Sequence, residues 1–330
     1  PVYDTQEAIY LGPQGILASL KEAIEVLEAG KEGLTVAGDI LYNGDVEKWI
    51  QFANSLRIRY LIRVSKRVDV QAELQAIVTE GRIFEGNEDN ALVNYLPSPP
   101  NQWFVHNIRA GDFGDVRMST TIQGVLEVLD DPRMHTWFKP TEASVASGET
   151  IYAGMPNGIG PATRGNYDFS EVSLPGFIFR EVPDGVDAVF MQYSELQYAL
   201  DEAAHNGWIS GDVNDYYEDG IRASFEYYNT DLPDDYLERE GVLLETETAL
   251  EQIITQKWLA SILVGYEGWF NFRRTGFPQL NIAVENLNND QFPVRYIYPA
   301  TEQALNLENY TEAVSRIGGD DYNVKNWWEK

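Results

Sequence analysis

An aromatic and polar stretch at residues 94–117 carries the clearest candidate ligand chemistry in the sequence. Flat aromatic rings stack on the apolar faces of sugars, while amides and charged groups bond sugar hydroxyls. The stretch has little periodicity, so we expect a long loop, and such loops in compact domains are often functional. The candidate ligand-binding residues are Trp103, with Tyr95, Phe104 and Phe113 as companion rings and Asn101, Asn107, Arg109 and Asp112 as hydroxyl partners. The alternative stays open that these rings attach a long loop to the helices beneath it.

Catalytic signatures are scarce in the rest of the chain. The three histidines, His106, His135 and His205, are far apart, and none has a second ligand at metal-binding spacing on one helix face. Neither a Gly-x-Ser-x-Gly elbow nor a phosphate-binding Gly-x-x-x-x-Gly-Lys-Ser/Thr loop occurs. We therefore predict no catalytic residue, no metal site and no cofactor.

Paired carboxylates leave one enzymatic alternative open. A glycosidase needs only an acid and a base about 5 to 9 Å apart, and the chain has 52 acidic residues from which to place them. Abundance is weak evidence, because doublets such as Asp130-Asp131 are more typical of helix caps, turns and solvated faces. We expect a protein that is not an enzyme, with a glycoside hydrolase on a helical scaffold as the alternative.

The composition excludes several classes of partner. A formal net charge of −28 would repel nucleic acid and anionic lipid surfaces. No run of roughly 18 apolar residues predicts a membrane helix. The lack of cysteine excludes disulfides and thiolate chemistry, and it suits both the cytoplasm and a bacterial cell exterior. The chain starts at Pro1 without Met or leader, so we expect a mature or cut form.

Three helical units are predicted to carry the loops. Apolar residues at helical spacing indicate helical hairpins over about residues 14–67 and 193–229, and a further helical unit over about 247–272. Shorter helices are expected at residues 70–80 and 120–130. Residues 82–117 and 131–191 are rich in Gly, Pro and Asn, which predicts loops with a little β structure, for example at Phe177–Phe179.

The stretch Thr248–Pro278 is expected to form a single buried helix around which the chain is organised. Thr248 and Glu251 match a capping box, apolar residues continue on more than one face to about Phe272, and Pro278 follows the end. Glu267 lies inside this apolar run. Because an unpaired buried carboxylate is costly, we expect Glu267 to pair with a buried arginine rather than to act in catalysis.

A cationic helix supplies candidate partners for such carboxylates. Arg57, Arg59 and Arg63 alternate with apolar residues in the second helix of the first hairpin. This pattern is typical of arginines that pass through a packed interface toward carboxylates such as Glu267. A role in nucleic-acid binding fits poorly with the net charge.

Several segments in a fixed order resemble the SusD/RagB family, in its SusD-like subgroup. The segments span nearly the whole chain, and as an ordered set they are highly specific, whereas single members would be weak. They are Gly38–Asp45 with Trp49 and Phe52–Arg59, Asp131–Arg133, Tyr193–Glu195 with Asp201–Ala204, Gln256–Trp258, Glu267–Trp269, Arg273–Pro278 and Asn326–Trp328.

The resemblance implies a single SusD-like domain over residues 1–330, mainly α, with a tetratricopeptide-like helical-repeat scaffold and loops along one side. It implies a surface-exposed outer-membrane lipoprotein of a Gram-negative bacterium that binds oligosaccharide, or in some relatives peptide, and delivers it to a SusC-like TonB-dependent transporter. The family's N-terminal helical unit and lipid anchor are not visible in this sequence. We therefore expect the N-terminal part to be missing and apolar surface to be exposed where it would pack. A helical-repeat module that binds only peptide or protein is a further alternative.

Overall fold

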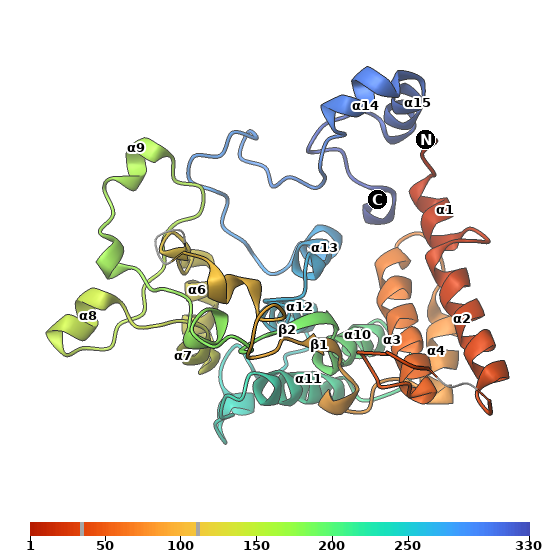
Figure 1. Cartoon of the computed structure of the whole chain (residues 1–330), viewed down its shortest axis with the longest axis horizontal. Helices are drawn as coiled ribbons and strands as arrows, with labels where there is room; N and C mark the ends of the chain where they lie inside the picture. The colour runs from red at the N-terminus through yellow and green to blue at the C-terminus, as the bar shows by residue number, and fades with distance from the viewer. Residues whose placement is uncertain (34–35, 110–112) are drawn as a thin grey trace.

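The computed structural model of the chain describes residues 1–33, 36–109 and 113–330, and helices dominate it (Figure 1). Two short strands, β1 (Ala91–Asn94) and β2 (Asp187–Met191), pair in antiparallel orientation. The helices are α1 (Gln6–Leu11), α2 (Ile16–Gly30), α3 (Val46–Val64), α4 (Gln71–Glu80), α6 (Thr120–Val128), α7 (Arg133–Trp137), α8 (Glu142–Ser147), α9 (Pro161–Arg164), α10 (Tyr193–His205), α11 (Val213–Tyr227), α12 (Ala249–Ala260), α13 (Glu267–Thr275), α14 (Ala300–Leu305) and α15 (Leu307–Ile317).

The first predicted hairpin is confirmed as α2 packed on α3, with α4 against α3. Asp45 caps α3, because its carboxylate accepts hydrogen bonds from the backbone N–H groups of Glu47 and Lys48 at 3.0 and 3.2 Å. The start of α2 differs from the prediction. Gly15 is its N-cap, and Pro13 lies in the turn that joins α2 to the additional helix α1.

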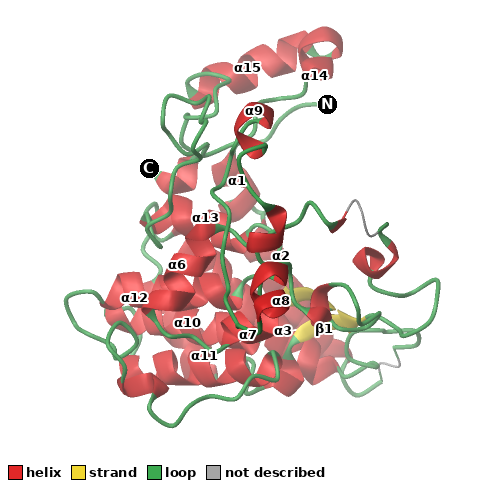
Figure 2. Cartoon of the chain, turned by 90° about the vertical axis from the view of Figure 1, so that its left-hand side faces the viewer, coloured by secondary structure: helices red, strands yellow, loops and turns green. Residues whose placement is uncertain are grey.

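Helix α10 lies at the centre of the scaffold, with ten of its thirteen residues buried. It forms the second predicted hairpin with α11 and also contacts α3 and α12 (Figure 2). One core cluster lies on its α3 side and a second on its α11 and α12 side. Because nearly every residue of α10 is buried, its polar side chains face other helices rather than solvent.

Ion pairs made by buried arginines join these helices. Arg59 of α3 donates two hydrogen bonds of 2.6 Å to Glu195 of α10. Arg63 of α3 donates to Glu267 of α13 at 2.5 Å, which confirms the predicted pairing of that carboxylate. A planar guanidinium suits such sites because it bonds both oxygens of a carboxylate at once.

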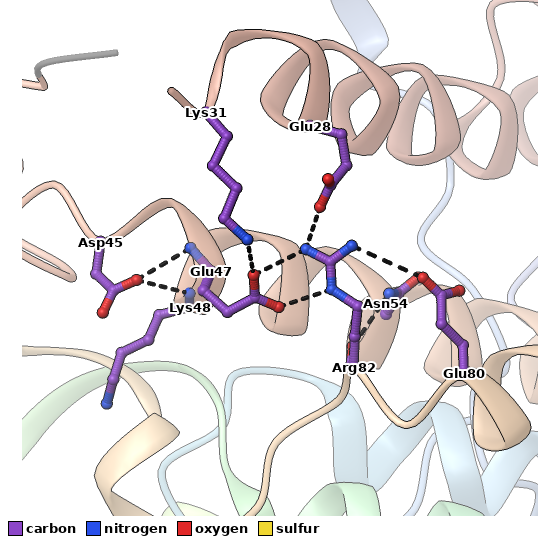
Figure 3. A network of polar contacts seen from close by, with 8 residues as sticks. All are labelled: Glu28, Lys31, Asp45, Glu47, Lys48, Asn54, Glu80 and Arg82. Atoms are coloured by element: carbon purple, nitrogen blue, oxygen red, sulfur yellow. Dashed lines mark hydrogen bonds and ion pairs between the residues drawn. The ribbon is translucent and has the colours of Figure 1, made fainter. Parts of the chain in front are cut away.

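A more exposed network holds the ends of the first three major helices together (Figure 3). Arg82, just after α4, donates to Glu47 of α3 at 2.7 and 2.9 Å, and it also pairs with Glu28 of α2 and with Glu80 of α4. Lys31, after α2, reaches the same Glu47 carboxylate. Because these side chains are partly solvated, each pair stabilises the fold by less than a buried pair does.

The predicted single helix over 248–272 is wrong, because a turn at residues 261–266 divides it into α12 and α13. Gly265 has φ +47°, a left-handed conformation that interrupts a helix. Eight of the twelve residues of α12 are buried, but only two of the nine in α13. The apolar spacing in the sequence runs through both helices and therefore did not reveal the break between them. The predicted capping box is also absent, since the Thr248 hydroxyl bonds Gln252 rather than the helix backbone.

The loop-rich parts contain more local structure than predicted. Residues 131–191 include the short helices α7, α8 and α9, and Phe177–Phe179 form a turn of 3₁₀ helix rather than a strand. Helices α14 and α15 near the C-terminus were not predicted from the sequence. Within the described ranges, none of the helices combines the length and apolar character needed to cross a membrane.

Candidate ligand-binding site

The two strands form the base from which the candidate loop leaves the scaffold. Residue 95 follows β1, whose last residue Asn94 pairs with Asp187 at the start of β2. The Asp187 carboxylate accepts hydrogen bonds from Asn94 at 2.8 Å and from the Tyr227 hydroxyl of α11 at 3.0 Å. Burial raises the pKa of Tyr227, with the nearby Asp187 charge adding to the effect, so the hydroxyl stays protonated and donates. The loop base is thus fixed to α11.

Hydrogen bonds to backbone carbonyl oxygens join the loop to the segment 177–183. The Trp103 backbone N–H donates to Pro183 O at 2.8 Å, and its indole N–H donates to Phe179 O at 2.9 Å. His106 contacts Arg180 O through Nδ1 at 2.8 Å, and the Arg180 guanidinium donates to a loop carbonyl at 2.6 Å. The bond from the indole N–H fixes the orientation of the Trp103 ring.

Three predicted rings come together in this loop. The Trp103 ring centroid lies 5.3 Å from that of Tyr95 and 4.4 Å from that of Phe104. The interplanar angles are 57° and 58°, so the three rings form a bent surface rather than a flat stack. Phe104 is 62% exposed, while Tyr95 and Trp103 are half-buried. The cluster, named here the ring cluster, combines a solvated apolar face with fixed orientation.

The predicted polar partners lie on the same loop with different roles. Asn101 is exposed, and its backbone carbonyl closes a turn by accepting a hydrogen bond from the Leu96 N–H at 2.7 Å. Asn107 is exposed and donates to Gln102 at 3.3 Å. Arg109 is exposed, and its carbonyl accepts a hydrogen bond from the backbone N–H of Phe113 at 3.0 Å. Asp112 lies outside the described residues.

Phe113 is separated from the ring cluster by its environment. Only 8% of its surface is exposed, and the Arg180 guanidinium lies 5.2 Å from its ring centroid. A ring buried in this way packs the loop against the segment 177–183 and offers no open face to a sugar. Of the four predicted rings, the structure therefore brings together Tyr95, Trp103 and Phe104.

The segment 177–183 is the part of the site that sequence reasoning missed. It acts through the carbonyl oxygens of Phe179, Arg180 and Pro183, which any residue type would supply. Phe177, at 65% exposed, adds a ring with Lys139 4.4 Å from its centroid. In the sequence, only the aromatic run Phe177–Phe179 could have indicated that this segment belongs to the site. In the parts of the chain that the structure describes, no three His, Cys, Asp or Glu side chains gather as a metal site would require.

Comparison with known proteins agrees with this architecture. The model of a family described as starch-binding and associating with the outer membrane matches residues 1–299. The chain belongs to the SusD-like family. Its mainly α fold with a tetratricopeptide-like scaffold is therefore confirmed, as is the association of this family with nutrient binding at the outer membrane.

Solved structures of SusD homologues superpose on the whole chain. One from Bacteroides fragilis NCTC 9343 has 30% sequence identity and a TM-score of 0.88, covering 100% of this chain and 76% of its own. A putative outer membrane protein from Bacteroides vulgatus ATCC 8482, described as probably involved in nutrient binding, has 30% identity and a TM-score of 0.88, covering 100% and 77%. A chitin-binding protein has 29% identity and a TM-score of 0.84, covering 100% and 74%. Comparison with curated proteins gave no match.

Proposed function

We propose that this SusD-like protein binds oligosaccharide at the cell surface through the ring cluster and delivers it to a SusC-like TonB-dependent transporter. The observation that carries the proposal is the placement of Tyr95, Trp103 and Phe104 as one partly exposed, bent aromatic surface. Sugar rings have apolar faces that stack on such surfaces. The remaining predicted contacts are Asn101, Asn107, Arg109 and Asp112 as hydroxyl partners and Phe113 as a packing ring.

Binding without catalysis is the second part of the proposal. The family is described by what it binds, and one relative is named as chitin-binding. We infer a surface-exposed lipoprotein that holds a nutrient chain until a transporter accepts it. Starch-like and chitin-like oligomers are the first ligands to test, because these two classes are named among its relatives.

The test is calorimetry of maltooligosaccharides and chitooligosaccharides with the wild type and with Trp103→Ala. Losing a stacking ring is expected to cost on the order of 1 to 3 kcal/mol of binding free energy, or roughly ten- to a hundredfold in Kd. Trp103→Phe is the matched control, because it keeps a ring but loses the indole hydrogen bond to Phe179 O. Circular dichroism checks that each variant is folded.

Unchanged affinity in a folded Trp103→Ala variant would contradict the proposed site and direct attention to the loops of residues 151–179. Sugar fragments released on prolonged incubation with a bound glycan would instead favour the glycoside hydrolase. Saturable binding of a peptide pool with no response to any glycan would favour the peptide-binding alternative.

A further inference from the structure

A pocket of about 430 Å³ lies beside both chain termini, between the start of α1, the end of α3, α15 and the last residues of the chain. Figure 1 shows α1, α15 and the two termini on the same side of the molecule. Five cationic side chains line this terminal pocket against two carboxylates, whereas the whole chain has 24 basic and 52 acidic residues. The cations are Arg67, Arg295, Arg316, Lys325 and Lys330, and the carboxylates are Asp4 and Glu7.

These cations are poorly neutralised by the protein. Over residues 1–33, 36–109 and 113–330, no carboxylate comes within ion-pair distance of Arg67, Arg295 or Lys325. Arg316 has Glu312 at 3.6 Å, one helical turn away on an exposed surface. This contrasts with the paired arginines of the scaffold. The Arg316 guanidinium also donates to Tyr3 O at 2.6 Å. In a chain with 52 acidic residues, a pocket whose other cations Arg67, Arg295 and Lys325 lack ion pairs in the described ranges is suited to an external anion.

Aromatic rings hold two of the guanidinium groups in position. Arg67 lies 5.1 Å from the ring centroid of Trp327, and Arg295 lies 5.4 Å from that of Tyr298. Arg295 also donates to a backbone carbonyl through Nε at 3.1 Å. Stacking on a ring limits the motion of a guanidinium and leaves its N–H groups free to bond an anion.

A neighbouring lysine responds to the same positive field. Burial lowers the pKa of Lys66, the charges of Arg274 and Lys325 lower it further, and the carboxylates of Glu329 and Glu202 oppose the shift. Lys325 thus contributes positive potential beyond the pocket itself, which a bound anion would reduce while forming hydrogen bonds.

We propose that the terminal pocket binds an acidic sugar unit, one that carries sulfate or carboxylate groups. Its volume lies within the range of about 300 to 1,000 Å³ typical of small-molecule sites, and Trp327 and Tyr298 add ring surface to the lining. An anionic membrane is a poorer match, because the net charge of −28 repels it and the cations line a concave site. The site shares no residue with the ring cluster, so it extends the proposed function to a second ligand class.

The experiment is calorimetry on the 330-residue chain with a sulfated heparin-derived disaccharide and with the neutral disaccharide of N-acetylglucosamine. We expect saturable binding of the sulfated probe that weakens as salt rises, because solvated charges are screened. Arg67→Gln and Lys325→Gln should each weaken it about five- to tenfold, since each removes one charge-assisted contact. Lys21→Gln, which removes an exposed charge on α2, is the matched control and should leave affinity unchanged.

Equal affinity in the wild type and Lys325→Gln, or equal affinity for the sulfated and the neutral probe, would overturn the proposal. Binding to phosphatidylglycerol vesicles without binding to the sulfated disaccharide would also overturn the proposal and favour a lipid ligand. Lys325 is exposed and contacts no ring among the described residues, so its variant should fold even if Arg67→Gln does not. Trp103→Ala should keep sulfated-probe binding, so failure of this proposal and failure of the ring cluster are told apart.

Discussion

The helical scaffold and the loop side use charged and aromatic residues in opposite ways. In the scaffold, charges such as Arg59 and Glu195 are buried and bonded to each other across helices. In the loop, the rings of Trp103 and Phe104 are partly exposed, and hydrogen bonds to carbonyl oxygens of a distant segment hold the loop in place. The difference teaches that residue type alone does not mark function. A charge in the scaffold contributes to stability, whereas we propose that a ring on the loop contributes a surface for ligand.

The largest expected effect is on the scaffold, in Arg59→Ala. This change leaves Glu195, 2% exposed, without its bidentate partner, and breaking a buried pair typically costs about 3 to 5 kcal/mol of unfolding free energy. Chemical denaturation measures the loss. Arg222→Ala is the control, since its pair with Glu218 is exposed and should contribute less than about 1 kcal/mol. Unchanged stability with weakened ligand binding would break the comparison.

The next effect concerns a buried acid of the scaffold. Both carboxylate oxygens of Asp201 on α10 lack a hydrogen-bond partner in the described part of the chain. Burial raises the pKa of Asp201 from 3.8 to about 8, with Glu202 raising it further and Lys257 opposing the shift. The folded state therefore favours the protonated acid.

The sign of the pH dependence follows from that pKa. The stability contributed by protonated Asp201 is fully present below about pH 3.8 and is lost as the pH rises through about 8. Asp201→Asn stays neutral, so it should exceed the wild type in stability at pH 7 by roughly 2 to 4 kcal/mol. Denaturation from pH 4 to 9 tests this, with the exposed Asp234→Asn as control. A constant difference across that range would count against it.

A pair of ring variants sharpens the comparison within the loop. Phe104→Ala should lower glycan affinity by on the order of 1 to 3 kcal/mol without changing the melting temperature, because the ring is 62% exposed. Phe113→Ala should lower the melting temperature and leave glycan affinity nearly unchanged, because its buried ring packs the loop. Calorimetry and thermal melts of both variants separate the two roles. The same response from both rings would show that the loop acts as one unit.

The smallest expected effect separates two helix starts in the scaffold. Asp45→Ala removes a cap that accepts two backbone hydrogen bonds and should cost about 1 kcal/mol of stability. Thr248→Ala should lower the stability by only about a few tenths of a kcal/mol, since the Thr248 side chain makes no cap bond to α12. Urea denaturation resolves the difference. Equal losses would mean that Thr248 caps α12 in solution.

The sequence by itself determined where the main scaffold helices form and which family the chain belongs to. Apolar periodicity and turn residues are local signals, so they predicted α3, α10 and α11 and the loop character of residues 82–117. It also predicted that Glu267 needs a buried arginine, because the cost of an unpaired charge does not depend on fold.

Only the tertiary structure decided which arginine meets which carboxylate and which rings stay exposed. Arg59 and Glu195 are 136 residues apart in sequence, and their pairing depends on how α3 packs on α10. Trp103 and Phe113 look alike in sequence, yet carbonyl groups of a distant segment orient one and the guanidinium of Arg180 covers the other. Backbone acceptors and covering side chains from remote segments leave no local pattern, so exposure could be established only in the folded chain.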